Sequence, residues 1–342
     1  MLNFPKHWLR PDAVSSALLP ASWLFAAVSA ARRALYGAGI LRSTRLRVPV
    51  IVVGNVTVGG TGKTPLVLAL LEDLRRSGRR PGVILRGYGA AAAGVAEVCA
   101  GDDPRAAGDE AVLLAVRSGC PVFRGRDRVA AASALLERHP DCDLIVSDDG
   151  LQHYRLARDI EIAVEDARGH GNGRMLPAGP LREPGNRKVD ALVLNGEPHP
   201  ERAAAIARLK YFRMQLVPDG WYELGKAPIE VEHSIDPKAL AGARLHALAG
   251  IGAPQRFFRT LEELGIRAVE HAFPDHHAFS ADDLRFDACD AVLMTEKDAV
   301  KCLQLARPVP CYVLRVQARL DPSFFEFIRT RLQGVRHGHP AA

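Results

Sequence analysis

Short runs of hydrophobic residues alternate with amphipathic stretches along most of the chain, and this alternation is typical of an α/β protein with a mostly parallel sheet. The first run, residues 50–53, holds only valine and isoleucine, as expected of a strand that is buried on both faces. After a glycine-rich turn, leucines at helical spacing predict a helix that ends at Gly78. Further strands are expected at 81–86, 121–124, 141–149, 160–164 and 191–194, with helices between them.

The second part of the chain repeats this pattern on a smaller scale. Strand-like alternation interrupted by prolines at residues 211–231 predicts a β linker. Beyond it we expect a helix ending at Gly265 and strands near Val269, at 291–294 and at 311–316. The predicted organisation is an N-terminal segment (1–48), a larger domain (49–210), the β linker (211–232) and a smaller C-terminal α/β domain (233–335).

The turn after the first strand has the composition of a phosphate-binding loop. It reads GNVTVGGTGKT, and Pro65 follows in the first helical turn. In such a loop, backbone N–H groups surround phosphate oxygens, a lysine reaches the β- and γ-phosphates, and a hydroxyl group binds Mg²⁺. Thr57 stands where the strict motif has its first glycine. The larger domain is therefore expected to be P-loop NTPase-like, with the nucleotide-binding residues Thr57, Val58, Gly59, Gly60, Thr61, Gly62, Lys63 and Thr64.

Acidic residues and one long loop mark further candidate sites. Asp148 and Asp149 end a hydrophobic strand, which is the usual place of a carboxylate that organises Mg²⁺ in a P-loop protein. Residues 169–184 predict a loop without secondary structure, and loops of this length are more often functional than idle. Asp109 and Glu110 open a predicted helix, and spacing alone leaves open whether they only interact with the helix dipole.

Composition and charge exclude several classes of protein. The chain has 342 residues, of which 48% are hydrophobic and 25% are charged, and this balance excludes a disordered or fibrous protein. The net charge of +6 lies entirely in residues 1–48, where seven basic residues stand against Asp12. Since the remainder is neutral and has no aromatic and basic stacking platform, no nucleic-acid partner is expected. The six cysteines and twelve histidines lack the spacing of a zinc site, so we expect reduced cysteines and no transition metal.

The N-terminal segment contains an uncharged run, residues 13–31, for which several interpretations compete. Pro20 and four serines argue against a spanning helix, and a nucleotide site that needs cytosolic ATP argues against a secretory signal. We prefer an interfacial helix whose apolar face enters the headgroup region while its arginines meet anionic lipid. A helix packed on the protein's own core stays open, because its periodicity would be the same.

Seven strings occur along the chain in an order that resembles one family of lipid kinases. They are GNVTVGGTGKTP, RGYG, GDE, SDDGLQH, GNGRMLPAGPLREP, the DHH segment and TEKDAVK. In this order they resemble the tetraacyldisaccharide 4′-kinase (lipid A 4′-kinase) family of Gram-negative bacteria, from the N-terminal segment to about residue 316. That family also carries a non-glycine residue at the place of Thr57.

The resemblance implies an enzyme of lipid A biosynthesis. Such an enzyme uses ATP and Mg²⁺ to transfer the γ-phosphate to the 4′-hydroxyl of tetraacyldisaccharide 1-phosphate, forming lipid IVA. It would act at the cytoplasmic face of the inner membrane, as a peripheral or monotopic protein. Its partners would be the acylated disaccharide lipid and the anionic membrane surface, and no protein partner is predicted.

The same resemblance implies roles for individual residues. Asp109 would accept the hydroxyl proton, His276 would keep this carboxylate oriented, and Lys63 would neutralise phosphate charge. A site between the two domains follows, because Asp109 and His276 lie in different ones. Mg²⁺ would be held or oriented by Thr64, Asp148, Asp149 and Glu183. Contacts to nucleotide or substrate are expected from Gln152, Arg128, His153 and Arg182.

The competing interpretation is a membrane-associated partition-type or metallochaperone P-loop ATPase, in which the nucleotide state switches partner binding. The loop of such proteins usually reads KGGxGKT. Here Val58 occupies the place of the leading lysine, which argues against a switch. The segment Thr295–Asp298 is expected only to start a helix, and Lys297 is given no catalytic role.

Overall fold

The strands of this protein form one continuous sheet. The computed structural model describes residues 5–89, 91–225 and 242–335, and within them the sheet has twelve strands in the order β10-β9-β11-β12-β8-β7-β6-β1-β5-β2-β4-β3. Neighbouring strands are parallel except for the pairs β8–β12 and β3–β4. This architecture confirms the expected α/β class with a mostly parallel sheet.

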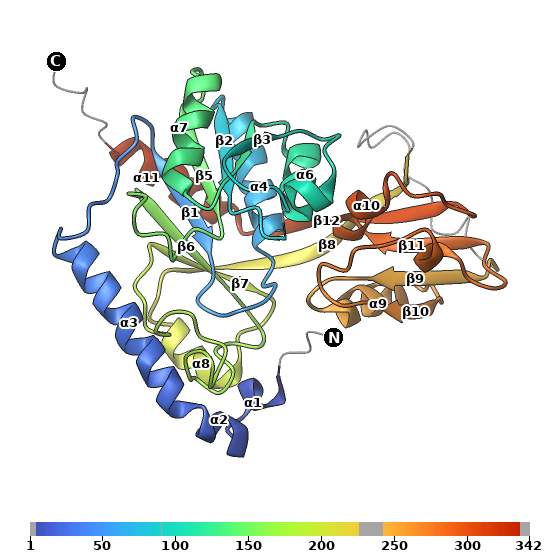
Figure 1. Ribbon diagram of the computed structural model, residues 1–342, viewed down its shortest axis with the longest axis horizontal. Coiled ribbons are helices and arrows are strands. Elements are labelled where there is room, and N and C mark those ends of the chain that lie inside the picture. Colours follow the sequence, from blue (N-terminus) through green and yellow to red (C-terminus); the bar gives the residue numbers. More distant parts are fainter. Residues whose placement is uncertain (1–4, 90, 226–241, 336–342) are drawn as a thin grey trace.

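The larger unit of the molecule contains the P-loop (Figure 1). Its strands are β1 (Val50–Gly54), β2 (Pro81–Leu85), β3 (Ala96–Val98), β4 (Val122–Arg124), β5 (Leu144–Asp148), β6 (Ile160–Asp166) and β7 (Ala191–Asn195). Its helices are α4 (Lys63–Arg76), α5 (Pro104–Ala107), α6 (Asp109–Ser118), α7 (Arg128–Arg138), α8 (Pro200–Ile206) and α11 (Pro322–Gly334).

The apolar residues of β1 explain why this strand lies at the centre. Ile51 and Val53 point into a core formed with α4, α6 and α11, whereas Val50 and Val52 point into a second core on the opposite face with α7. A strand covered on both faces needs no polar position. The sequence-based expectation for residues 50–53 is therefore confirmed.

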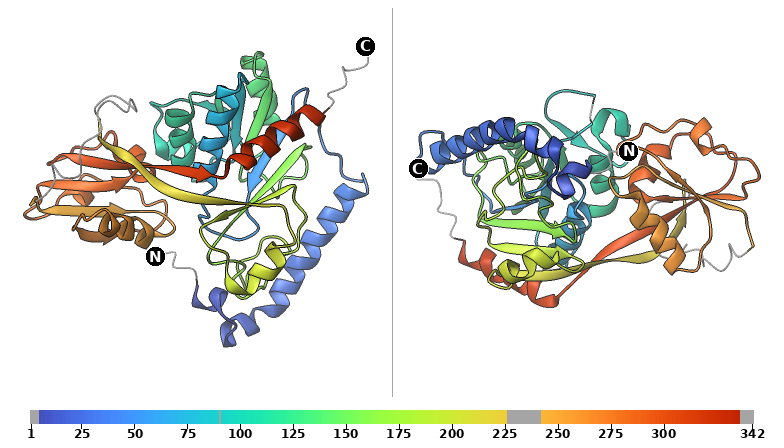
Figure 2. Two further views of the ribbon diagram at one scale, coloured as in Figure 1. Left: turned by 180° about the vertical axis from the view of Figure 1, so that it is seen from behind. Right: turned by 90° about the horizontal axis from the view of Figure 1, so that it is seen from below.

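The smaller unit extends the same sheet. Its strands are β9 (Leu245–Ala249), β10 (Val269–Ala272) and β11 (Ala291–Thr295), and its helices are α9 (Pro254–Glu263), α10 (Glu296–Cys302) and the short 3₁₀ helix η3 (Asp282–Leu284). Two long antiparallel strands, β8 (Tyr211–Glu223) and β12 (Cys311–Leu320), run from the larger unit into the smaller one (Figure 2). The expected β linker thus begins as a strand of the sheet itself.

The division into domains stays a prediction, with one correction. Helix α11 was expected in the C-terminal domain, but its residues Phe324, Ile328 and Leu332 lie in the core of the larger unit. The reason is that β12 carries the chain back across the sheet before α11 begins. Residues 1–4 of the N-terminal segment, 226–232 of the linker and 233–241 of the smaller domain lie outside the described residues.

The N-terminal segment forms α1 (Lys6–Leu9), α2 (Ala13–Ala17) and α3 (Leu19–Gly37), and α3 runs along one side of the larger unit (Figure 1). Ser15 and Ser22 are buried, and the Ser22 hydroxyl donates to the Met175 carbonyl at 2.7 Å. Trp23 and Leu24 on the other face are 66% and 67% exposed. Ser15 and Ser22 therefore face the protein, whereas Trp23 and Leu24 face outward. Among the described residues, no helix combines the length and apolarity that crossing a membrane requires.

Candidate active site

The predicted strand, loop and helix of the P-loop are present as β1, residues 55–62 and α4. Gly62 caps α4 with a φ of 94°, and a Cβ atom there would lie 2.6 Å from Nδ2 of Asn195, so both conformation and space require glycine. The Asn195 Nδ2 group donates to the Thr61 carbonyl at 3.0 Å. Lys63 and Thr64 open the helix, and its unpaired N–H groups form a site suited to phosphate.

The unusual Thr57 has a structural explanation. Thr57 forms a β-bridge with Leu181 of the long loop. On either side, the Val58 N–H donates to the Pro180 carbonyl at 2.9 Å and the Arg182 N–H donates to the Val56 carbonyl at 2.7 Å. The first half of the P-loop is therefore extended and paired, and only its second half needs the freedom of glycine.

The two acids at the end of β5 have opposite electrostatic environments. Asp149, with a φ of 49°, accepts from Nη1 of Arg182 at 2.9 Å and lies 3.7 Å from Nζ of Lys63. Burial favours its neutral form, but these two cations outweigh burial and lower the pKa of Asp149 to about 2. Asp148 is buried, and among the described residues no salt bridge joins its carboxylate to a cation. Burial and the nearby charges of Glu110 and Asp149 raise the pKa of Asp148 to about 7 against the opposing charge of Lys63.

The donor set suits a magnesium ion that arrives with a nucleotide. Oδ1 of Asp148 is buried and has no hydrogen-bond partner among the described residues. A buried carboxylate oxygen of this kind favours a cation ligand, and Mg²⁺ in such sites takes one or two carboxylates together with phosphate oxygens and water. The part of the chain that the structure describes contains no group of three or more His, Cys, Asp or Glu residues that could hold a metal. The residues present therefore fit Mg²⁺ only if phosphate and water complete its ligand shell.

Glu183 contacts side chains of the N-terminal helix and of the larger unit. Its buried carboxylate accepts from the Tyr154 hydroxyl at 2.6 Å and from Nη1 of Arg33 at 2.8 Å, and lies 3.4 Å from Nη1 of Arg187. Glu183 thus has three partners, of which Arg33 belongs to α3. The expected role of Glu183 as a Mg²⁺ ligand stays a prediction. In this arrangement Glu183 fastens the N-terminal helix to the loop that pairs with the P-loop.

Asp109 and His276 meet across the two units. Nδ1 of His276 lies 2.9 Å from Oδ2 of Asp109, and Oδ1 of Asp109 accepts from the Glu110 N–H at 2.8 Å. The choice of His276 over its neighbour agrees with the geometry, since His277 instead contacts Asp283. The hydrogen bond to Asp109 raises the pKa of His276 against the effect of burial. Burial opposes ionisation of Asp109, but His276 and Lys297 outweigh it and lower the pKa of this carboxyl group.

Lys297 is a residue of the site that the sequence analysis missed. Its ammonium Nζ lies 3.9 Å from Oδ2 of Asp109, 3.3 Å from Oε1 of Glu110 and 3.3 Å from Oδ1 of Asp275. The available signal was its position in TEKDAVK, directly after strand β11, because polar groups at the carboxyl ends of parallel strands often form sites.

Three other predicted residues contact the protein around the site. Arg128 is buried and donates to the Gly125 carbonyl at 2.8 Å and to the Asp149 carbonyl at 3.4 Å. Nε2 of Gln152 donates to the Asn55 carbonyl at 3.2 Å, and Asn55 in turn accepts from Nζ of Lys63 at 3.3 Å. His153 lies beside Asp127 at 3.9 Å, and burial lowers the pKa of His153 to about 4. Their contacts to nucleotide or lipid stay predictions.

The smaller unit lies against the P-loop. A Cβ atom on Gly252, in the turn between β9 and α9, would stand 3.6 Å from the Gly60 nitrogen. Nη2 of Arg256 in α9 donates to Asp166 at the end of β6 at 2.8 Å, and Nη2 of Arg168 donates to the Gly60 carbonyl at 2.7 Å. Phosphate-binding loop, acidic pair and the Asp109–His276 pair therefore face one another where the units meet.

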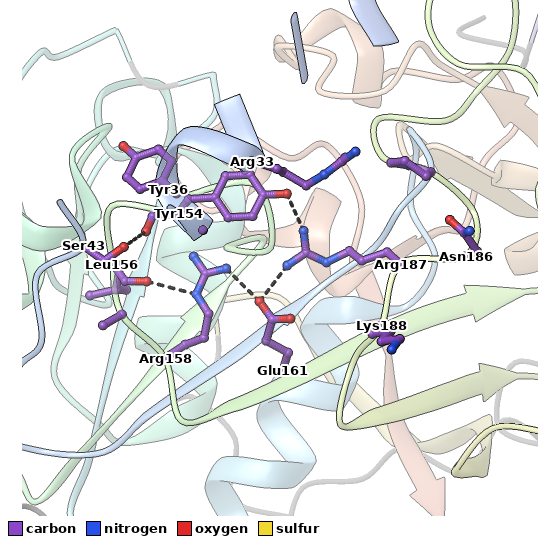
Figure 3. A pocket seen from close by; sticks show the side chains of 13 residues that line it. Arg33, Tyr36, Ser43, Tyr154, Leu156, Arg158, Glu161, Asn186, Arg187 and Lys188 are labelled. Carbon is purple, nitrogen blue, oxygen red and sulfur yellow. Dashed lines mark hydrogen bonds and ion pairs between the residues drawn. The ribbon is translucent and has the colours of Figure 1, made fainter. Parts of the chain in front are cut away.

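A separate cavity of about 580 Å³ lies between α3 and the larger unit. Arginine and tyrosine side chains line it, and the Tyr154 hydroxyl, Arg187, Glu161 and Arg158 are linked in series (Figure 3). Arg33 of α3 is also part of the lining. This cavity shares no residue with the P-loop, the acidic pair or the Asp109–His276 pair.

Fold and site together define a P-loop protein equipped for phosphoryl transfer, with the Asp109–His276 pair where the two units meet. The family model for tetraacyldisaccharide-1-P 4′-kinase matches residues 14–333. The chain therefore belongs to this kinase family.

Individual relatives agree with the family model. The chain is 49% identical to the tetraacyldisaccharide 4′-kinase of Azoarcus sp. over 100% of this chain and 98% of the relative. It is 50% identical to that of Chromobacterium violaceum over 97% and 98% of the two chains. The crystal structure of apo-form LpxK from Aquifex aeolicus in complex with ATP matches with a TM-score of 0.77 at 29% identity, over 93% of this chain and 99% of that one.

Proposed function

We propose that this protein transfers the γ-phosphate of ATP to the 4′-hydroxyl of tetraacyldisaccharide 1-phosphate, with Asp109 as the general base. The observation that carries the proposal is the Asp109–His276 pair, which stands opposite the phosphate site where the two units meet. A carboxylate that is buried, ionised and held by an imidazole is suited to accept a proton from an alcohol. A switch ATPase would have no need of such a base.

The proposed step follows from the positions of these groups. The 4′-oxygen forms a bond to the γ-phosphorus, the bond from that phosphorus to the bridging oxygen breaks, and ADP leaves with the electron pair. The hydroxyl proton passes to Asp109, while His276 keeps the carboxylate turned toward the acceptor. Lys63 and the N–H groups at the start of α4 stabilise the charge on the phosphates.

The expected magnesium ion would be held by Asp148 and Thr64, and when bound it would neutralise phosphate charge. Asp149 is engaged by Lys63 and Arg182, so its role is to hold these two cations in place. In this proposal Asp148 binds the metal, whereas Asp149 binds the cationic side chains.

The same proposal places the enzyme at the anionic cytoplasmic surface of the inner membrane. The outward apolar face of α3, with Trp23, Leu24 and Val28, supports this location, because it has no protein partner among the described residues to cover it. The cavity beside α3 carries several cationic side chains and supports binding of an anionic amphiphile between the helix and the larger unit.

The deciding experiment follows the γ-phosphate. The wild-type protein and the Asp109→Asn variant are incubated with γ-labelled ATP, Mg²⁺ and tetraacyldisaccharide 1-phosphate in detergent micelles. We expect label in the lipid with the wild type, and a loss of at least about 100-fold with the variant at unchanged ATP binding. ATP hydrolysis without labelled lipid would instead favour the switch ATPase. Equal transfer by both proteins would refute the role of Asp109 as base.

A further inference from the structure

Charged groups from both units lie near the carboxylate of Asp109, and among the described residues Lys297 is the lysine within 4 Å of it. Lys297 lies in the first turn of α10 and is less than one fifth exposed. Its ammonium group has three carboxylate partners, of which two come from the start of α6 and one, Asp275, precedes His276. One half-buried ammonium group therefore contacts three acids that would otherwise repel one another.

The neighbouring residue of α10 shows that this helix is fixed on α6. Glu296 and Arg117 form an ion pair in which both side chains are buried, and the Val316 N–H also donates to Glu296. This pair lies toward the carboxyl end of α6, whereas Lys297 reaches the amino end of the same helix. Helix α10 thus presents two consecutive charged side chains to the two ends of α6.

We propose that Lys297 is a positioning residue of the reaction, whose ammonium group holds Asp109, Glu110 and Asp275 in one array so that Asp109 stays ionised and paired with His276. This inference rests on the proposed role of Asp109 as general base. Without the cation, the three carboxylates would separate or one of them would take up a proton. Asp109, which is the most buried of the three, would then no longer be ready to accept the hydroxyl proton.

The proposal predicts a change in pH dependence with a defined sign. The charged groups that face Asp109 are His276, Lys297 and Lys301, together with the acids Glu110 and Asp275. Removing Lys297 takes away a positive charge that favours the ionised carboxylate, so the pKa of Asp109 should rise. Since the protonated carboxyl group cannot act as a base, the acidic limb of the kcat profile should move to higher pH.

The experiment compares Lys297→Met, Lys297→Arg and wild type in the lipid phosphorylation assay from pH 3.5 to 9, because the lowered pKa of Asp109 places the wild-type limb below its ordinary value of 3.8. For Lys297→Met we expect kcat to fall on the order of tenfold and the acidic limb to move up by about one pH unit, with KM for ATP within about twofold. Lys297→Arg keeps the cation and should keep the limb at its wild-type position. Lys297→Gln, which keeps a hydrogen-bond donor without the charge, replaces the methionine variant if that variant does not fold.

The control variant Arg117→Met/Glu296→Gln removes the adjacent ion pair without touching Asp109. It should leave the acidic limb in place, because only the contact between α6 and α10 is weakened. The proposal is overturned if Lys297→Met retains the wild-type limb, or if the control or Lys297→Arg moves the limb as far. Asp109→Asn in the same assay tests the role of Asp109 as general base separately. If this variant still transfers phosphate, the role of Asp109 as base is refuted, and the role of Lys297 is a different question.

Discussion

The outward face of α3 allows a quantitative test of membrane attachment. Trp23, Leu24 and Val28 are 66%, 67% and 60% exposed, so replacing all three by glutamine removes apolar surface that contributes little to the folded core. Glutamine is a good helix former, and the helix should therefore persist. The change isolates the contribution of the apolar face from that of the fold.

The expected magnitude follows from the exposed area. Full burial of a side chain of this kind contributes about 1.5–3 kcal/mol, so two thirds of it contributes about 1–2 kcal/mol for each residue. Together the three side chains should contribute at least about 3 kcal/mol to membrane binding, and their loss should weaken binding at least about 100-fold. The basic side chains of the segment, about 1 kcal/mol each near an anionic surface, should remain and make the residual binding salt-dependent.

The assay is co-sedimentation with vesicles of phosphatidylcholine and phosphatidylglycerol at low and at physiological salt. Leu264→Gln/Leu303→Gln serves as the matched control, because these side chains are also exposed (39% and 42%) but lie on the smaller unit. The thermal unfolding temperature of both variants should stay within a few degrees of wild type. Binding of the triple variant within threefold of wild type would refute the anchor.

Point substitutions are preferable to deletion of residues 1–30. Such a deletion would also remove the buried Ser15 and Ser22, which contact Arg174 and Met175 of the long loop. That loop pairs with the P-loop through Leu181. A truncated protein could therefore lose activity for a reason unrelated to the membrane.

Three further predictions concern the site. His276→Gln should lower kcat by about 100-fold, and it should lower the free energy of unfolding most between about pH 4 and 6.5. The lowered pKa of Asp109 stabilises the fold above its ordinary value of 3.8, whereas the raised pKa of His276 stabilises it fully below 6.5 and less as the pH rises through the raised value. Urea unfolding at pH 5.5 and at pH 9 checks this prediction, and an equal loss of stability at both would contradict it. Lys63→Met should reduce kcat by at least about 100-fold and lower the melting temperature, because Asp149 loses one of its two cations, and retention of transfer would reject its role on the phosphates. Arg33→Met should raise KM for the lipid and destabilise the protein by about 1–3 kcal/mol, because the buried Glu183 loses a partner. The double variant Arg33→Met/Glu183→Gln should recover part of that stability. Strictly additive effects in the double-mutant cycle would argue against an interaction between Arg33 and Glu183.

The amino-acid sequence by itself determined the elements whose signals are local. The run at residues 50–53, the glycine-rich turn and the leucine stripe after it specify a buried strand, a loop and a helix, because hydrophobic periodicity and glycine conformations act within a few residues. The order of the motifs also indicated the family and, through it, the Asp109–His276 pair. The sequence motif alone does not explain Thr57, whereas the structure does, because Thr57 forms a β-bridge with Leu181.

Tertiary structure decided how these local pieces face one another. Ser22 of α3 turns toward the long loop, whereas Trp23, Leu24 and Val28 turn outward, and helical periodicity cannot specify this direction because it is the same for both faces. Glu183 takes Arg33 as a partner 150 residues away in sequence, and Lys297 reaches Glu110 across 187 residues. Such ion pairs depend on which strands become neighbours in the sheet, and that order is set by the packing of the whole chain rather than by any single segment.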